Sequence, residues 1–323
     1  MAHHASLPKS LAQKLPEKMS ALMRTSNFFL DFTLEDRSVG TGIHGKVLAC
    51  RSKDPKKLDE QFAVKTMVLS VANLESIRHH IELCPHPNIM EIKHVYCNEF
   101  LQDNCPFVLY NNSKAGMHLI LVMECKKDGD LYELILSGYF NHTTETDVAA
   151  IFKEIAQGVC QIHEKGLVHG DLKAENILCE FDDAKNLHLI LTDFESLHQV
   201  KYPPPLHIYT KAYVSPELLD NIERKKCKQP LKPIGFGTDI WALGVLLFIL
   251  LTGEAPFYSL RREGLDYNDR LTPFFCQSVN ASIFEMPKKS RPACDLLKKM
   301  LHPFPQLRIS IQDVLAHPFL ADS

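Results

Sequence analysis

The stretch from position 169 to position 176, His-Gly-Asp-Leu-Lys-Ala-Glu-Asn, concentrates side chains that could share one chemical task. Asp171 supplies a carboxylate, Lys173 an ammonium group and Asn176 a carboxamide. A carboxylate can accept the proton of a hydroxyl group, an ammonium group can neutralise a phosphate, and a carboxamide oxygen can bind a hard metal ion. Together the three groups suit the transfer of a phosphoryl group to a hydroxyl.

Three further segments carry groups that such a reaction needs. Residues 40–45, Gly-Thr-Gly-Ile-His-Gly, can let backbone N–H groups approach phosphates without a side-chain clash. Lys65 ends a strand-like run and could hold phosphate oxygens, and Asp193 begins the triplet Asp-Phe-Glu. A dinucleotide-binding fingerprint would need a helix directly after the glycines, but residues 47–49 (Val-Leu-Ala) are strand-like, so we reject that interpretation.

In this order the four segments resemble the signature set of eukaryotic protein kinases, and the resemblance extends over residues 32–320. It implies an α+β fold of two lobes. A small, β-rich N-lobe would cover about residues 32–126 and a larger, helical C-lobe about residues 127–320. Residues 1–31 are polar and would form an N-terminal tail or extension, which we expect to be flexible or loosely docked.

The resemblance also implies a site for ATP and Mg²⁺. Met123 would limit the back of the adenine pocket, and residues 124–126 would form the hinge whose backbone meets adenine. Asn176 and Asp193 would be the Mg²⁺ ligands. The full set of implied ATP-site residues is Val39, Gly40, Gly42, Gly45, Val47, Ala63, Lys65, Glu75, Met123, Glu124, Lys126, Leu178 and Asp193.

Catalytic roles follow from the same resemblance. Asp171 would accept the proton of the substrate hydroxyl, and Lys173 would neutralise the moving phosphoryl group. Asn176 is the third catalytic candidate. Lys173 two residues after Asp171, with Thr210 in the substrate loop, resembles serine/threonine rather than tyrosine kinases. The expected partner is therefore a protein substrate with a serine or threonine acceptor.

A helix is predicted over residues 70–83, because its apolar residues recur on one face. The resemblance implies that a glutamate of this helix pairs with Lys65. Glu75 and Glu82 are the two candidates. We favour Glu75, because it lies in the middle of the helix and Glu82 lies near its end.

Potential zinc ligands gather at the end of the same helix. They are His79, His80, Cys84 and His86. The kinase resemblance already explains His86 as part of a turn. A zinc site is therefore the weaker interpretation.

Two positions depart from the kinase pattern. Gly170 replaces the arginine that usually precedes the catalytic aspartate, and Glu195 replaces the glycine that usually follows Asp-Phe. Two hypotheses remain. We favour an active kinase, because the positions that would hold phosphate and metal are filled. The alternative is a catalytically weak pseudokinase that acts as a scaffold or allosteric partner.

The sequence also predicts helices and strands that would hold these motifs in position. Thr144 and Asp147 form a capping-box-like start for an amphipathic helix over residues 144–162. Residues 187–192 form a strand that leads to Asp193, and three prolines at 203–205 keep the following segment extended. The kinase resemblance further implies that Glu217 and Arg308 form a buried ion pair.

Composition narrows the function classes. The chain has 323 residues, 45% of them hydrophobic, and a net charge of −3 without a basic stripe, which disfavours nucleic acid or an anionic membrane as the main partner. Its longest apolar run, residues 241–251, is too short to span a bilayer. The ten cysteines form no Cys-x-x-Cys pair, which favours reduced thiols in a cytoplasmic or nuclear protein. The sequence does not indicate an oligomeric state.

Overall fold

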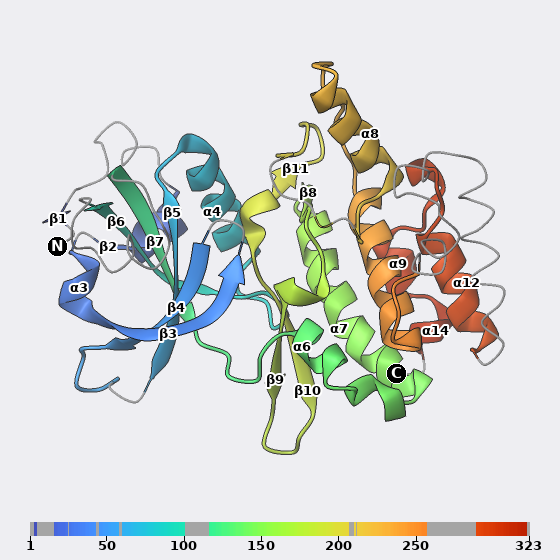
Figure 1. Cartoon of the computed structure of the whole chain (residues 1–323), viewed down its shortest axis with the longest axis horizontal. Coiled ribbons are helices and arrows are strands. Elements are labelled where there is room, and N and C mark those ends of the chain that lie inside the picture. The colour runs from blue at the N-terminus through green and yellow to red at the C-terminus, as the bar shows by residue number, and fades with distance from the viewer. Residues whose placement is uncertain are drawn as a thin grey trace. The chain divides into compact units, whose positions relative to one another are not determined.

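The computed structural model describes residues 3–4, 16–24, 26–42, 45–57, 60–100, 116–206, 210, 212–256 and 289–321. Its contacts divide the chain into two compact units, Met1–Lys127 and Asp128–Ser323, and each unit is described by itself. The first unit is built on a β-sheet and the second mainly on helices (Figure 1). The predicted α+β fold class, β-rich first and helical second, is thereby confirmed.

The sheet of the first unit has seven strands in the order β1-β6-β7-β5-β4-β3, with β2 beside β6. These strands are β1 (His3–His4), β2 (Met23–Arg24), β3 (Phe32–Gly42), β4 (Gly45–Ser52), β5 (Gln61–Val68), β6 (Ile92–Phe100) and β7 (Gly116–Glu124). Strands β3, β4 and β5 are antiparallel neighbours, and Gly42 pairs with Gly45 where β3 turns into β4. The predicted strand–glycine turn–strand arrangement is confirmed.

Three helices accompany the sheet: α2 (Glu17–Leu22), α3 (Phe28–Asp31) and α4 (Val71–Leu83). Helix α4 confirms the helix predicted over residues 70–83. It begins after Ser70, whose side chain accepts a hydrogen bond from the backbone N–H of Asn73. Such a cap typically stabilises a helix by about 1 kcal/mol. The apolar residues behind the prediction, Leu74, Ile77 and Ile81, are buried.

Described residues 16–31 dock more closely than the sequence suggests. Phe28 is fully buried, and its ring stacks on Phe32 with the centroids 5.3 Å apart. Strand β2 also pairs in parallel with β6. The prediction of a flexible or loosely docked tail is therefore wrong for these residues. Burying one Phe side chain alone stabilises the folded state by roughly 1.5–3 kcal/mol. The cluster that Phe28 completes comprises Phe28, Phe32, Leu48, Cys50, Phe62, Val64, Tyr96, Ile120 and Val122.

Two neighbouring strands of the sheet, β6 and β7, are joined by a long connection. Strand β6 continues to Phe100 and β7 begins at Gly116, while residues 101–115 lie outside the described part of the chain. Residues 118–123 of β7 are all buried, as expected for a central strand that is covered on both faces.

The second unit contains helices that surround a small group of short strands. The helices are α6 (Leu131–Leu136), α7 (Glu145–Glu164), α8 (Pro216–Lys226), α9 (Gly237–Thr252), α12 (Arg291–Met300), α13 (Ile311–Leu315) and α14 (Pro318–Ala321), with short 3-10 helices η1 (Tyr139–His142), η2 (Ala174–Asn176), η3 (Phe194–Ser196) and η5 (Pro305–Leu307). The strands are β8 (Leu167–Val168), β9 (Ile177–Phe181), β10 (Leu187–Leu191) and β11 (His198–Gln199). Strand β9 pairs with β10, and β8 pairs with β11.

Helix α7 has the predicted capping box, in which Thr144 and Asp147 exchange side-chain-to-backbone hydrogen bonds. Its apolar face is buried and packs against α9 and β10 (Figure 1). Helix α9 is buried along almost its whole length and ends at Gly253, whose positive φ of 78° suits a glycine. Helix α7 also contacts β8, so it supports two of the short strands directly.

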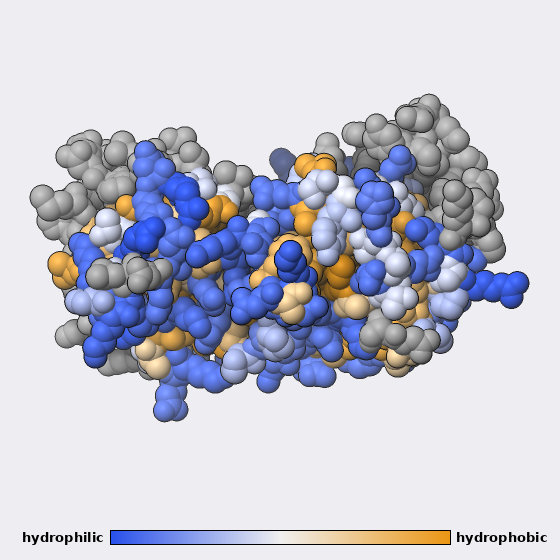
Figure 2. Space-filling model, turned by 90° about the horizontal axis from the view of Figure 1, so that it is seen from below, coloured by the Kyte–Doolittle hydropathy of each residue, from blue (hydrophilic) through white to orange (hydrophobic). Residues whose placement is uncertain are grey.

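Charged and polar side chains stay largely on the outside. On the face that Figure 2 shows, hydrophilic residues predominate and hydrophobic residues lie in small groups. Within the described residues, no helix is both long and apolar enough to cross a membrane.

Candidate active site

The predicted catalytic loop is anchored by a buried carboxylate. Asp239, in the first turn of α9, is only 1% exposed. Its Oδ2 accepts a hydrogen bond from the backbone N–H of His169 (2.8 Å), and its Oδ1 accepts one from Gly170 (3.0 Å). His163 on α7 places Nε2 3.0 Å from Oδ2. The loop is therefore tied to both α7 and α9 immediately before Asp171.

The electrostatics of this anchor are consistent with an ionised carboxylate. Burial alone would raise the pKa of Asp239, but the hydrogen bond and charge of His163, with further help from His169 and Gly170, hold that pKa below its usual value. This residue was not singled out in the sequence analysis. Its signal was a lone carboxylate at the start of an otherwise apolar helix, because buried carboxylates are almost always paired.

The three predicted catalytic residues meet in one place. The ammonium group of Lys173 lies 2.9 Å from Oδ2 of Asp171. The Asn176 side chain donates to the Asp171 backbone carbonyl (2.8 Å) and to Oδ2 (3.2 Å). Asp171 is 6% exposed, so its carboxylate is held in a fixed orientation. The loop thus presents a carboxylate and an ammonium group side by side.

Thr210 joins this group from the segment that precedes α8. Its hydroxyl accepts a hydrogen bond from Lys173 (3.1 Å) and donates a long one to Oδ1 of Asp171 (3.4 Å). A cavity of about 20 Å³ lies beside these residues and is lined in part by Gly170, Asp171 and Thr210. This volume is enough for about one water molecule. Oδ1 of Asp171 thus accepts a hydroxyl group in this structure, while Oδ2 is held by Lys173 and Asn176.

The two predicted Mg²⁺ ligands lie at the same end of one hairpin. Ile177 on β9 pairs with Leu191 on β10, and the backbone N–H of Thr192 donates to the carbonyl of Asn176 (3.0 Å). This register places Asp193 beside Asn176. Because Nδ2 of Asn176 is engaged by Asp171, its Oδ1 is the atom left to bind a metal ion. A carboxylate and a carboxamide oxygen fit Mg²⁺, which prefers oxygen ligands.

Asp193 itself has an unusual backbone. Its φ of 61° and ψ of 64° lie in the left-handed region, which aspartate tolerates better than most residues. The following Phe194 is buried, and its ring lies 5.2 Å from the ring of His169. The catalytic loop and the Asp-Phe-Glu triplet are therefore packed together. Glu195 follows in η3 and is half-buried.

Gly170 has a structural reason for being glycine. Its φ is +81°, and a β-carbon at this position would lie 2.9 Å from the carbonyl oxygen of Ser196 and 3.3 Å from its β-carbon. The close approach is possible because His198 in β11 pairs with Val168 in β8. An arginine, the usual residue here, does not fit this backbone.

In the first unit, the predicted phosphate- and adenine-binding residues share one face of the sheet. Ala63 pairs with Met123, and Lys65 follows Ala63 by two residues on β5. Since side chains alternate along a strand, these three point to the same face. The aromatic cluster around Phe28 uses the alternate residues, such as Val64, and so fills the opposite face. The glycine turn at 42–45 joins β3 and β4 of this sheet.

The hinge residues follow directly on β7. Cys125 donates its backbone N–H to the carbonyl of Gln61 (3.4 Å), and Lys126 lies 3.1 Å from the carboxylate of Glu124. In the second unit, Leu178 forms an isolated bridge with Asp130. These contacts show where the predicted residues lie, and their nucleotide-binding roles stay predictions.

The favoured partner of Lys65 is engaged elsewhere. Glu75 binds Arg78 on its own helix (2.7 Å), and its side chain is 56% exposed. Glu82 binds the same arginine at 2.9 Å. The predicted pairing of Glu75 with Lys65 is not made in this structure, because an arginine one turn away holds that carboxylate on the helix surface.

The suggested zinc ligands have other contacts. Nε2 of His80 lies 2.5 Å from the carbonyl oxygen of Met90, and Nδ1 of His86 accepts the backbone N–H of Asn88 at 3.1 Å. His79 lies 3.7 Å from Glu75. Of these three side chains, His80 links α4 to the segment before β6, His86 braces the loop between them, and His79 stays on its own helix.

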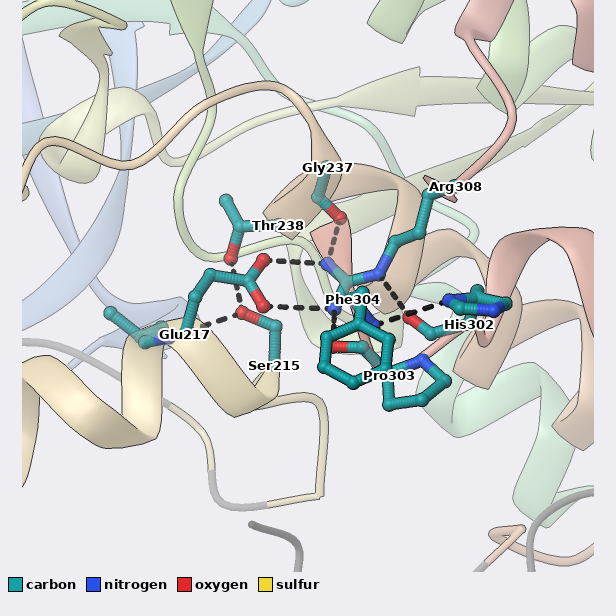
Figure 3. A network of polar contacts seen from close by, with 9 residues as sticks. Ser215, Glu217, Gly237, Thr238, His302, Pro303, Phe304 and Arg308 are labelled. Atoms are coloured by element: carbon teal, nitrogen blue, oxygen red, sulfur yellow. Dashed lines mark hydrogen bonds and ion pairs between the residues drawn. The ribbon is translucent and has the colours of Figure 1, made fainter. Parts of the chain in front are cut away.

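The predicted pair of Glu217 and Arg308 is confirmed (Figure 3). Arg308 donates from Nη1 to Oε1 at 2.5 Å and from Nη2 to Oε2 at 2.8 Å, a bidentate geometry. Its side chain is 1% exposed, and Nη1 also donates to the carbonyl of Gly237. The guanidinium lies over the Trp241 ring, 5.0 Å from its centroid. This pair fixes the start of α8 to the start of α9.

Comparison with known proteins places these features in a family. A family model described as protein kinase domain matches residues 34–320. MAP kinase-activated protein kinase 2 of Drosophila melanogaster is 29% identical over 298 residues, covering 90% of this chain and 74% of that protein. MAP kinase-activated protein kinase 5 of Homo sapiens is 28% identical, covering 88% and 59%. Calcium-dependent protein kinase 4 of Plasmodium falciparum (isolate 3D7) is 29% identical, covering 87% and 48%.

Proposed function

The chain belongs to the protein kinase family and is a protein serine/threonine kinase; we propose that Asp171, Lys173 and Asn176 transfer the γ-phosphoryl group of Mg²⁺-bound ATP to a protein hydroxyl. The observation that carries this proposal is the contact of the Asp171 carboxylate with both Lys173 and Asn176. Phosphoryl transfer depends on positioning and charge neutralisation more than on covalent help, and this group supplies both.

Asp171 acts on the acceptor hydroxyl. Asn176 and Lys173 bind Oδ2, so Oδ1 is the oxygen that receives the substrate hydroxyl, as it now receives the longer bond from Thr210. Hydrogen bonding to Oδ1 orients the hydroxyl for attack, and the carboxylate takes its proton as the new bond forms. General-base assistance of this kind contributes roughly 10²–10⁴-fold to the rate.

Lys173 supplies positive charge next to the reacting oxygen. Its ammonium group lies within hydrogen-bond distance of both Asp171 and Thr210, so it is held by two partners. A fixed cation stabilises the negative charge on the equatorial oxygens of the transferring phosphoryl group without needing to reorganise. Replacing the ammonium by a neutral group removes this stabilisation and leaves the fold intact.

Nucleotide and metal are bound by the residues assigned from the kinase resemblance. Asn176 and Asp193 would hold Mg²⁺, which would neutralise charge on the phosphates. Lys65 and the backbone of residues 40–45 hold the phosphates, and Met123 with residues 124–126 holds adenine. The position of Lys65 and Met123 on one face of the sheet supports this assignment.

The alternative of a catalytically weak pseudokinase finds no support in the comparisons, whose similar proteins are named as kinases. The position of Gly170 also weakens it, because that glycine satisfies a backbone requirement and leaves Asp171 in contact with Lys173. We further propose that the protein works in the cytoplasm or nucleus. Buried thiols such as Cys97 and Cys179 are free, which suits a reducing compartment.

A peptide-library assay tests this function. Purified protein receives ATP labelled at the γ-phosphate, Mg²⁺, and peptides whose single acceptor is serine, threonine or tyrosine. We expect label on serine and threonine peptides, and none with Lys65→Met or Asp193→Asn at an unchanged melting temperature. Lys93→Met is the matched control, because Lys93 binds only Glu91 in the described contacts. Label confined to tyrosine, or transfer near the wild-type rate in either variant, would overturn the proposal.

A further inference from the structure

A second cavity lies in the first unit, where the docked extension meets the sheet. Its volume is about 640 Å³, within the usual size of small-ligand sites. Arg24 comes from the extension, His94 from β6, and Lys53 and Lys57 from the turn after β4. None of these residues belongs to the predicted ATP site.

The cavity lies on the other face of the sheet from the predicted ATP site. Phe32, Phe62 and Tyr96 line it, and all three belong to the buried aromatic cluster. Ala63 and Lys65 point to the opposite face because they alternate with the cluster residues on β5. A ligand in this cavity would therefore not compete with ATP for the same space.

Arg24 is held in place by a neutral partner. Its Nε and Nη2 lie 3.1 Å and 2.9 Å from Nδ1 of His94. A nitrogen that accepts from a guanidinium carries no proton, so His94 is the neutral tautomer with its hydrogen on Nε2. Burial, and then the charges of Arg24 and Lys57, lower the pKa of His94 and agree with this assignment. His94 therefore fixes the orientation of the Arg24 guanidinium group without neutralising its charge.

Among the described residues, only one of the two wall lysines has an ion pair, and that pair is long. Lys53 donates to the backbone carbonyl of Phe29 at 2.6 Å, and Lys57 reaches Glu60 only at 3.9 Å. Asp31 is one of the two carboxylates in the cavity wall. It already accepts hydrogen bonds from the hydroxyl groups of Ser26 (2.6 Å) and Tyr96 (2.8 Å). Within the described part of the chain, the three cations that line this cavity therefore share one long ion pair, between Lys57 and Glu60.

The other wall carboxylate, Asp54, serves the turn. Its Oδ1 accepts the backbone N–H of Lys56 at 3.0 Å, which fixes the chain between Lys53 and Lys57. The wall therefore holds three cations and two carboxylates, which leaves an excess of one positive charge. This balance favours an anion that can bind several donors at once.

We propose that this cavity is a binding site for a phosphomonoester, with Arg24 as its main contact and Lys53 and Lys57 as supporting cations. The guanidinium fork of an arginine matches two phosphate oxygens, and a lysine adds a point charge. Arg24 lies on β2, which is paired with β6. A bound phosphate would therefore tie the extension to the turn after β4 and hold the extension on the sheet.

Titration calorimetry tests the site on the full chain. Inorganic phosphate and phenyl phosphate are the probes, and a saturating non-hydrolysable ATP analogue with Mg²⁺ occupies the ATP site. We expect both probes to bind, and Arg24→Ala to weaken binding at least about tenfold, as expected for charge-assisted hydrogen bonds. Lys57→Gln should weaken it several-fold while leaving the extension untouched, since Lys57 lies outside it. Tighter binding of phenyl phosphate would identify an organic phosphomonoester, and equal binding would identify the free ion.

Arg37→Ala is the matched control. Arg37 is an exposed arginine of the same unit that contacts Glu35 and Gln61 and does not line the cavity. Its removal should leave both affinities unchanged. No binding of either probe to the wild type would overturn the proposal, as would equal weakening by Arg37→Ala and Arg24→Ala. Peptide phosphorylation by the wild type is measured separately, so failure of this site does not bear on the kinase assignment.

Discussion

Gly170 lies directly against the backbone of Ser196. A β-carbon at position 170 would approach the Ser196 carbonyl oxygen to 2.9 Å, closer than real β-carbons come to a carbonyl. The positive φ of +81° adds a second reason for glycine. The glycine that replaces the usual kinase arginine therefore permits the close approach of the catalytic loop to the segment after Asp193.

We expect Gly170→Ala to lower both stability and activity. The left-handed backbone costs a non-glycine residue roughly 1–2 kcal/mol, and the contact with Ser196 adds to it by pushing the segment after Asp193 away. Gly166→Ala is the matched control, because Gly166 has a φ of +70° and a β-carbon added there would meet nothing within 4 Å. Thermal denaturation and kcat/KM should show a larger loss at position 170. Equal losses in the two variants would show that the contact between position 170 and Ser196 contributes nothing to stability or activity.

Phosphatase treatment should leave activity unchanged. The arginine that grips an activation-segment phosphate in many kinases is absent, and Gly170 has no side chain to replace it. The hydroxyl of Ser196 is buried, and that of Thr210 is already bound to Lys173. Mass spectrometry before and after treatment, with a parallel peptide assay, checks this. A large loss of activity that accompanies loss of a phosphate from residues 196–210 would contradict it.

Arg308→Ala should lower the melting temperature sharply. Its side chain is 1% exposed and binds Glu217 through both terminal nitrogens, so removing it leaves a carboxylate without its partner. Breaking a buried pair costs about 3–5 kcal/mol. The control is Arg224→Ala, which removes a more exposed pair with Asp220 and should cost about 0–1 kcal/mol. Similar melting temperatures for the two variants would show that the buried pair contributes no more than a surface one.

Local patterns predict much of the fold and the site. The capping box at Thr144 and the clustering of Asp171, Lys173 and Asn176 depend on residues close in sequence, and both are predictable from it. The pair of Glu217 and Arg308 is distant in sequence and could be predicted only through the family resemblance.

Other features depend on partners that a single sequence does not reveal. Asp239 anchors a loop about seventy residues earlier, and its apolar surroundings give no hint of this partner. Phe28 docks because Phe32 and Tyr96 leave room for it on the sheet. The place of Glu75 in its helix suggests a pair with Lys65, but the nearby Arg78 competes for its charge. In each case a contact with another side chain determines the structure, and the local sequence pattern does not reveal that contact.

The role of Asp171 is tested most directly by the single-turnover rate of phosphoryl transfer in Asp171→Asn. Asparagine keeps the shape of the side chain and its place beside Lys173 and Asn176, but it cannot accept the hydroxyl proton. We predict that the variant melts and binds Mg·ATP like the wild type, while the transfer rate to a serine peptide falls by roughly 10²–10⁴-fold. Transfer by Asp171→Asn at the wild-type rate, with nucleotide binding intact, would contradict the account.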